Sequence, residues 1–138
     1  RILIMGLPGS GKTTLAKVLQ ERLSNCSWYN ADEIRRIYND WDFSPEGRLR
    51  QAKRMFDFST LDIEDGQEYV ICDFVAPTNE IRNIFDADFT IWMDTINQGR
   101  FEDTNKLFEN PTSVNLTITD FKYDIDYIVY RIVNYEQS

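Results

Sequence analysis

Short apolar runs alternate with segments of helical periodicity along the whole chain. Runs of four or five mainly apolar or alternating residues predict strands at residues 1–5, 27–30, 69–72, 89–93 and 114–118. Apolar residues that recur every three or four positions predict helices at residues 12–24, 45–65 and 124–136, and shorter helices are expected at residues 32–38 and 78–85. Residues 98–108 are polar and poorly periodic, and we expect a helix with a mobile end there. This alternation predicts one α/β domain over residues 1–138, with a mainly parallel five-stranded sheet flanked by helices in three layers.

Polar residues mark the starts of two of these helices. Asp32 is the predicted N-cap of the helix at residues 32–38, and Ser44 is the predicted N-cap before Pro45. The residues expected on the inner side of the helix at 45–65 are Leu49, Ala52, Phe56, Ser59 and Ile63. Residues 114–118 alternate strictly, which predicts a half-exposed edge strand.

Composition excludes several kinds of chemistry. None of the 138 residues is histidine, so neither a histidine zinc site nor a histidine general base can exist in this chain. The 15 Lys and Arg against 23 Asp and Glu give a net charge of −8, which disfavours general nucleic-acid or anionic-membrane binding. Cys26 and Cys72 are expected to be reduced. No apolar run approaches the roughly 20 residues of a membrane span, and we expect a cytoplasmic protein.

Basic residues gather in one part of this acidic chain. Residues 35–54 hold six Lys or Arg and three Asp or Glu. Two interpretations stay open: a solvated helix face, or a local anion site.

A phosphate-binding loop follows the first predicted strand. Residues 6–13 (G-L-P-G-S-G-K-T) fit the pattern G-x-x-x-x-G-K-[ST] in full, with a strand before and a helix after. Glycines let backbone N–H groups turn toward a phosphate, Lys12 can reach the β- and γ-phosphates, and the Thr13 hydroxyl can bind Mg²⁺. The motif predicts a P-loop NTPase fold that binds ATP or GTP. The expected contacts are Gly6, Pro8, Gly9, Ser10, Gly11, Lys12, Thr13 and Thr14.

A second candidate metal ligand ends the predicted strand at residues 69–72. Asp73 follows this apolar run directly, as the acid of a Walker-B motif does, and it would hold Mg²⁺ with Thr13. An Asp that merely begins a turn is the alternative.

Switch GTPases, motor ATPases and small-molecule kinases share such a loop. The chain has no Asn-Lys-x-Asp element for reading guanine, and it leaves little room for the additional elements of a motor. A compact domain with a second anion site favours a small-molecule kinase that uses ATP and Mg²⁺.

Several segments resemble the adenylylsulfate kinases. Residues 30–35 (N-A-D-E-I-R), residues 42–48 (D-F-S-P-E-G-R) and the pair Gln51 and Arg54 are similar to that family's D-G-D-N-[IV]-R, G-F-S-x-x-x-R and E-N-I-R-R. Residues 6–14, residues 74–77 (F-V-A-P) and residues 94–95 (D-T) are similar to its G-L-S-G-A-G-K-T-T, F-I-S-P and D-T. The resemblance covers roughly residues 1–108.

The resemblance implies transfer of the ATP γ-phosphoryl group to the 3′-hydroxyl of adenosine 5′-phosphosulfate. It implies that Arg35 and Arg48 hold the phosphosulfate, that Phe43 stacks on the adenine, and that Asp32 faces the attacking hydroxyl. Lys12 and Asp32 are then the catalytic residues. The remaining residues that it assigns to the acceptor are Gln51, Phe74, Val75 and Ala76.

The chain departs from that family in its acceptor motifs and in its lid. Asn30 stands where the family has the first Asp of its D-G-D, and Gln51 stands where it has Asn. The family's long lid is nearly absent, and the residues expected to remain of its charge clamp are Arg100 for ATP and Lys106 for the acceptor. Three alternatives therefore stay open: a kinase of another nucleoside or small molecule, a kinase of a nucleic-acid end, and a nucleotide-binding regulatory module. A homodimer also stays open.

Overall fold

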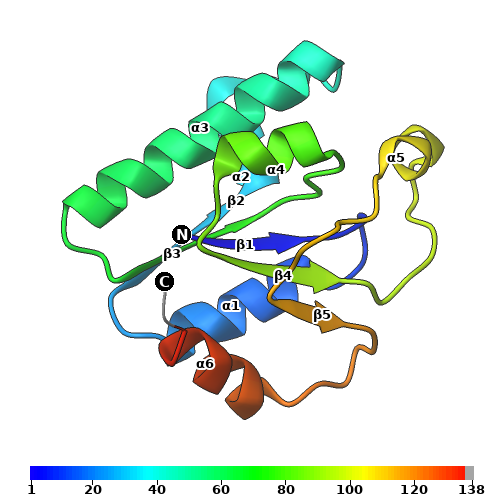
Figure 1. The fold of residues 1–138 in the computed structure, drawn as a ribbon. Coiled ribbons are helices and arrows are strands. Elements are labelled where there is room, and N and C mark those ends of the chain that lie inside the picture. The colour runs from blue at the N-terminus through cyan, green and yellow to red at the C-terminus, as the bar shows by residue number, and fades with distance from the viewer. Residues whose placement is uncertain (136–138) are drawn as a thin grey trace.

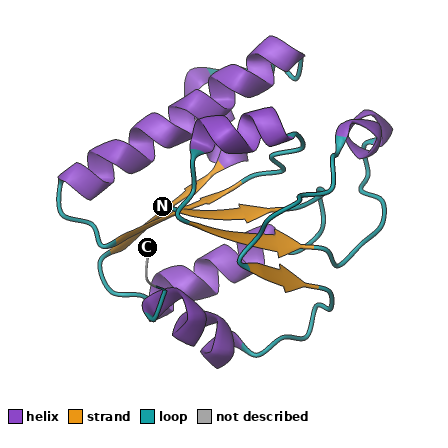
Figure 2. Ribbon diagram, in the orientation of Figure 1, coloured by secondary structure: helices purple, strands orange, loops and turns teal. Residues whose placement is uncertain are grey.

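The computed structural model describes residues 1–135, which form a parallel sheet with helices on both faces (Figures 1 and 2). The strands are β1 (Ile2–Met5), β2 (Cys26–Asn30), β3 (Tyr69–Asp73), β4 (Phe89–Met93) and β5 (Leu116–Ile118). The helices are α1 (Lys12–Arg22), α2 (Ala31–Tyr38), α3 (Pro45–Glu64), α4 (Asn79–Phe85), α5 (Glu102–Leu107) and α6 (Ile125–Val133). The five strands run in the order β2-β3-β1-β4-β5 and pair only in parallel, which confirms the predicted α/β class.

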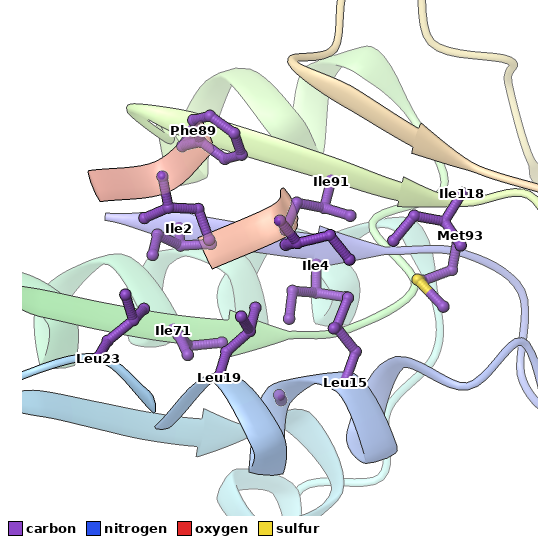
Figure 3. Close-up of a cluster of buried hydrophobic side chains, with 13 residues drawn as sticks. Ile2, Ile4, Leu15, Leu19, Leu23, Ile71, Phe89, Ile91, Met93 and Ile118 are labelled. Carbon is purple, nitrogen blue, oxygen red and sulfur yellow. The ribbon is translucent and has the colours of Figure 1, made fainter. Parts of the chain in front are cut away.

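The sheet is buried on both faces. Helices α1 and α6 cover one face, and α2, α3 and α4 lie over the other (Figure 1). Side chains alternate along a strand, so Ile2 and Ile4 of β1 pack toward α1 (Figure 3), whereas Leu3 and Met5 pack toward α3 and α4. This double burial explains why β1 is a continuous apolar run rather than an alternating one.

Two helix starts differ from the prediction. The N-cap of α2 is Asn30, whose side-chain oxygen accepts hydrogen bonds from the N–H groups of Asp32 and Glu33, so the prediction of Asp32 as the cap was wrong. Thr78 lies outside α4 as its N-cap, bonded to the N–H of Ile81. The N-cap predicted at Ser44 is confirmed, since its side chain accepts a hydrogen bond from the N–H of Gly47.

The buried face of α3 includes most of the predicted side, since Leu49 and Phe56 are partly buried against the core, and it extends beyond that side. Its buried residues are Gly47, Gln51, Ala52, Met55 and Ser59. Ile63, expected inside, is 39% exposed. Ala52 and Ser59 belong to both the predicted side and the observed buried face of α3. Gln51 and Met55 complete the observed face at helical spacing, so the polar side chain of Gln51 is buried.

Two predicted helices are shorter in the structure. Residues 98–101 are not helical, because the side chain of Asn105 bonds both the N–H and the C=O of Gly99 and folds the segment back before α5. The last described helix, α6, begins after its N-cap Asp124 and ends at Val133, and residue 136 of the predicted helix lies outside the described residues. Within residues 1–135, no helix is long and apolar enough to span a bilayer.

Candidate functional site

The phosphate loop joins β1 to α1 at the carboxyl edge of the sheet. Gly9 and Gly11 have φ values of 89° and 97°, in the left-handed region that glycine tolerates. A Cβ on Gly6 would lie 2.7 Å from the carbonyl oxygen of Met93, so a side chain does not fit there. Gly11 caps α1 without a side-chain hydrogen bond, which leaves the first N–H groups of the helix for an anion.

Lys12 is largely buried beside this loop. Its ammonium group donates a hydrogen bond to the carbonyl oxygen of Leu7 at 3.0 Å. Burial lowers the pKa of Lys12 to about 8, while the nearby Asp73 and Asp32 act in the opposite direction. A bound phosphate would supply the negative charge that this lysine lacks.

Asp73 ends β3 and is 2% exposed. Its Oδ1 accepts hydrogen bonds from the Thr13 hydroxyl at 3.3 Å and from the Asn30 side-chain amide at 3.1 Å. Its Oδ2 accepts a hydrogen bond from the indole N–H of Trp28 at 2.6 Å. Burial raises the pKa of Asp73, and the hydrogen bonds from Trp28 and Asn30 oppose that rise.

Trp28 and Asn30 were not among the predicted site residues. Asn30 ends β2 and pairs in register with Asp73 at the end of β3. Had strand order been known, the matching strand ends would have identified Asn30; nothing in the sequence pattern marks Trp28. Both belong to the cluster because neighbouring parallel strands end at one edge of the sheet.

The Thr13 and Asp73 oxygens fit a magnesium ion. Mg²⁺ takes oxygen ligands and is usually held by one or two protein groups together with water and substrate phosphates. Within residues 1–135, no group of three or more Cys, Asp and Glu side chains is arranged to hold a metal by itself. A hydroxyl and a carboxylate beside a phosphate loop therefore fit a metal shared with a nucleotide.

A cleft of about 540 Å³ runs from the phosphate loop to the predicted acceptor side. Its lining includes Lys12, Thr13 and Asp73 from the phosphate-loop side and the predicted acceptor residues Asp32, Phe43 and Arg48. Trp41, Arg100 and Phe101 also line it. A smaller cavity of about 80 Å³ adjoins it, and its lining includes Arg35, Gln51, Phe74, Val75 and Ala76. The structure thus brings most of the predicted acceptor residues together around two connected spaces.

Arg35 lines the smaller cavity, but its guanidinium group already has partners. The side chain is 5% exposed and donates to the carbonyl oxygens of Asp40 at 3.0 Å and Asp42 at 3.1 Å. Its guanidinium carbon lies 4.2 Å from the centre of the Phe43 ring. Burial lowers the pKa of Arg35. Arg35 therefore shapes the loop that carries Phe43.

Arg48 keeps more of its guanidinium N–H groups available than Arg35 does. Its Nε donates to the carbonyl oxygen of Phe43 at 2.9 Å, and one terminal nitrogen lies 3.5 Å from the Thr104 hydroxyl. No ion pair to a carboxylate joins it within residues 1–135. Its remaining N–H groups can meet an anion in the cleft.

The other basic residues of the segment 35–54 are paired with acids. Arg36 pairs with Glu33, Arg50 with Asp40 and Asp42, Lys53 with Asp57, and Arg54 with Asp40. The solvated-face interpretation therefore holds for these four residues. Arg35 and Arg48 remain as the candidate residues of the anion site.

The two residues expected to replace the lid clamp lie in different places. Arg100 lines the cleft, with its guanidinium group 5.5 Å from the centre of the Phe101 ring. The Lys106 side chain is 74% exposed, pairs with Glu102 at 3.5 Å, and lines neither cavity. The structure thus does not bring Lys106 to the acceptor.

A further cavity of about 430 Å³ adjoins the phosphate loop. Its wall is formed by Gly9, Gly11 and Thr14 together with Phe121 and Tyr123 from the segment after β5. The Phe121 ring is half exposed and comes within 3.5 Å of where a Cβ on Gly11 would sit. No sequence pattern connects these two aromatic residues with the loop, because they lie more than a hundred positions away from it.

A family model described as the AAA domain matches residues 2–110. The chain belongs to this AAA-domain family. The match includes the phosphate loop, Asp73 and the whole acceptor side of the cleft. No curated protein sequence matches this AAA-domain chain.

Solved structures show which fold this AAA-domain chain has. The APS kinase CysC of Mycobacterium tuberculosis, in complex with AMPPNP and APS, is 20% identical with a TM-score of 0.71, over 96% of this chain and 94% of that one. A sugar kinase from Janibacter sp. HTCC2649 is 15% identical with a TM-score of 0.70, over 96% and 91%. Shikimate kinase from Aquifex aeolicus is 18% identical with a TM-score of 0.63, over 96% and 93%. The chain therefore has the P-loop kinase fold.

Proposed function

We propose that this protein transfers the γ-phosphoryl group of ATP to the hydroxyl group of a small acceptor, with adenosine 5′-phosphosulfate as the first candidate. One observation carries the proposal: a single cleft of about 540 Å³ is lined both by phosphate-loop residues and by Asp32, Phe43 and Arg48. Phosphoryl transfer requires both substrates in one water-poor space with the reacting oxygens in line.

The residues of the cleft divide the work between the two substrates. The free N–H groups of α1 and the Lys12 ammonium group bind the β- and γ-phosphates, and Thr13 and Asp73 hold Mg²⁺. The metal supplies charge neutralisation at these phosphates when bound. Asp32 orients the attacking hydroxyl and accepts its proton as the new oxygen–phosphorus bond forms and the bond to ADP breaks.

The acceptor class follows from the far end of the cleft. Phe43 is half exposed, and an aromatic face binds a planar ring. Arg48 offers guanidinium N–H groups to sulfate or phosphate oxygens. A phosphorylated or sulfated nucleoside combines these two features, and the APS-bound kinase of the same fold supports that choice.

The donor base has its own candidate pocket. The cavity beside Phe121 and Tyr123 adjoins the phosphate loop and presents an exposed aromatic face to a nucleotide base. Replacing Phe121 with alanine should weaken ATP binding several-fold, measured by titration calorimetry. The matched control is Tyr130→Ala, because Tyr130 is an exposed aromatic residue on α6 outside all of these cavities.

A coupled ADP-release assay tests the proposal. ATP and Mg²⁺ are supplied with adenosine phosphosulfate, nucleosides, nucleotides, sugar acids or 5′-hydroxyl oligonucleotides in turn. We expect adenosine phosphosulfate to stimulate ADP release most strongly. Stimulation by a different acceptor would refute the substrate but leave the kinase; tight ATP binding without stimulation by any acceptor would indicate a nucleotide-binding module.

Two variants sharpen this assay. Asp32→Asn should lower kcat by about 100-fold with little change in ATP affinity, because it removes a proton acceptor. Arg48→Ala should mainly raise the KM of the acceptor. Lys53→Ala is the matched control on the same helix, since Lys53 is exposed and pairs with Asp57 outside the cleft.

A further inference from the structure

The side-chain amide of Asn30 joins two parts of the cleft. Its Nδ2 donates to Thr13 Oγ1 at 3.2 Å and to the two Asp73 oxygens at 3.1 and 3.3 Å. Its Oδ1 accepts from the N–H groups of Asp32 at 3.0 Å and Glu33 at 3.2 Å, at the start of α2. One planar group thus contacts the candidate metal ligands at one end and a helix N-terminus at the other.

These two ends cannot move independently. An amide is rigid and planar, so a rotation that changes the partners of Nδ2 also displaces Oδ1. In the structure, Thr13 Oγ1 donates to Asp73 and accepts from Asn30. A cation on the Thr13 oxygen would compete with the Asn30 hydrogen bond for its lone pairs, so that Nδ2 would turn toward Asp73 and Oδ1 would shift relative to the N–H groups of Asp32 and Glu33.

Helix α2 extends this connection to the acceptor end. Asp32 lies in its first turn and lines both spaces. Arg35, one turn further along, donates to the carbonyl oxygens of Asp40 and Asp42 and stacks on Phe43. A shift of α2 therefore reaches the attacking-hydroxyl side and the aromatic wall through contacts that are all present in the structure.

We infer that Asn30 is a positioning residue that couples nucleotide binding at Thr13 and Asp73 to the placement of α2, and hence to acceptor affinity. The inference rests on the proposed function, because it concerns the two substrates of that cleft. A carboxylate at this position could cap α2 equally well but could not donate to Asp73, so the amide is what the connection needs. Because coupling between binding sites is reciprocal, the acceptor must also tighten nucleotide binding.

Backbone amide hydrogen exchange of residues 31–38 provides the test. It is measured with and without Mg²⁺ and the ATP analogue AMPPNP at saturation. In the wild type we expect exchange in α2 to slow by at least about 5-fold, the lower end of typical coupling between sites. In Asn30→Ser the helix stays capped, because serine is as good an N-cap as asparagine, but the shorter side chain does not reach Asp73. AMPPNP should then bind without slowing exchange in α2.

A control variant tests whether the effect is specific to the cap of α2. Asp124→Ala removes the N-cap of α6, which accepts from the N–H groups of Asp126 and Tyr127, and it should leave the nucleotide effect on α2 unchanged. AMPPNP binding to the wild type without a change in α2, or an unchanged effect in Asn30→Ser, overturns the coupling alone. Failure of the wild type to bind AMPPNP overturns both the coupling and the proposed function.

Discussion

Replacing Arg35 with alanine distinguishes a residue that builds the acceptor loop from one that only binds an anion. Arg35 is the buried member of the basic segment, and its guanidinium group holds the carbonyl oxygens of Asp40 and Asp42. The same group stacks on Phe43. The substitution therefore removes the link between α2 and the loop before α3.

The magnitude follows from these contacts. A hydrogen bond from a charged group contributes about 1.5–3 kcal/mol, and a partly buried cation–π contact about 1 kcal/mol. Relief of the buried charge offsets part of this loss, because burial already lowers the pKa of Arg35. We expect Arg35→Ala to lower the free energy of unfolding by about 3 kcal/mol.

The neighbouring residue on the same helix is the control. Arg36 is 68% exposed and pairs only with Glu33 among the described residues, so Arg36→Ala should cost about 0–1 kcal/mol. Urea unfolding followed by circular dichroism measures both values without any ligand. Equal destabilisation by the two variants, to within about 0.5 kcal/mol, would refute the structural role of Arg35.

Three further predictions concern the phosphate-loop end of the cleft. Burial lowers the pKa of Lys12 to about 8, so above that pH the unfolded chain binds more protons than the folded one. The free energy of unfolding of the wild type, relative to that of Lys12→Met, should therefore rise between about pH 8 and about pH 10 in urea titrations. A difference that falls over this range would contradict the prediction. Asn30→Asp places a second carboxylate against Asp73, so without metal it should lower the free energy of unfolding by about 1–3 kcal/mol. Added Mg²⁺ should restore the lost stability. A melting temperature that responds to Mg²⁺ no more than that of the wild type would be inconsistent with this contact. Gly6→Ala should lower the free energy of unfolding by about 2 kcal/mol, because its Cβ would lie 2.7 Å from a carbonyl oxygen. Gly66→Ala, with open space around its Cβ, should lower it by only about 1 kcal/mol, because of the backbone conformation alone. Calorimetric melts compare the two variants.

The order of elements and the phosphate loop were predictable because both depend on local patterns. A strand buried on both faces, a glycine-rich turn and an amphipathic helix each have a recognisable sequence pattern within about a dozen residues. Helix ends were less predictable where a side chain acts across the boundary. Asn30 rather than Asp32 caps α2 because its strand-end position lets the side chain reach the next N–H groups.

The charge pattern alone could not predict the roles of the basic residues in the segment 35–54. Arg48, Arg50 and Arg54 lie on one helix, yet of these three only Arg48 forms no ion pair within the described residues. The difference depends on where the preceding loop places Asp40, which forms ion pairs with both Arg50 and Arg54. The family resemblance singled out Arg35 and Arg48 from this segment, and the folded loop gives the physical reason why Arg50 and Arg54 pair with Asp40 instead.

The hydrogen-bond donors around Asp73 explain why a neutral amide suits the position of Asn30. A buried carboxylate needs hydrogen bonds to stay ionised, and the donors around Asp73 are the uncharged side chains of Trp28, Asn30 and Thr13. The nearest ammonium group, that of Lys12, donates instead to the carbonyl oxygen of Leu7. Neutral donors keep the negative charge on Asp73 without cancelling it, so that charge stays available to attract a cation into the cleft. A carboxylate in place of Asn30 would remove one donor and add a competing charge, and the site would then depend on the metal for its own stability.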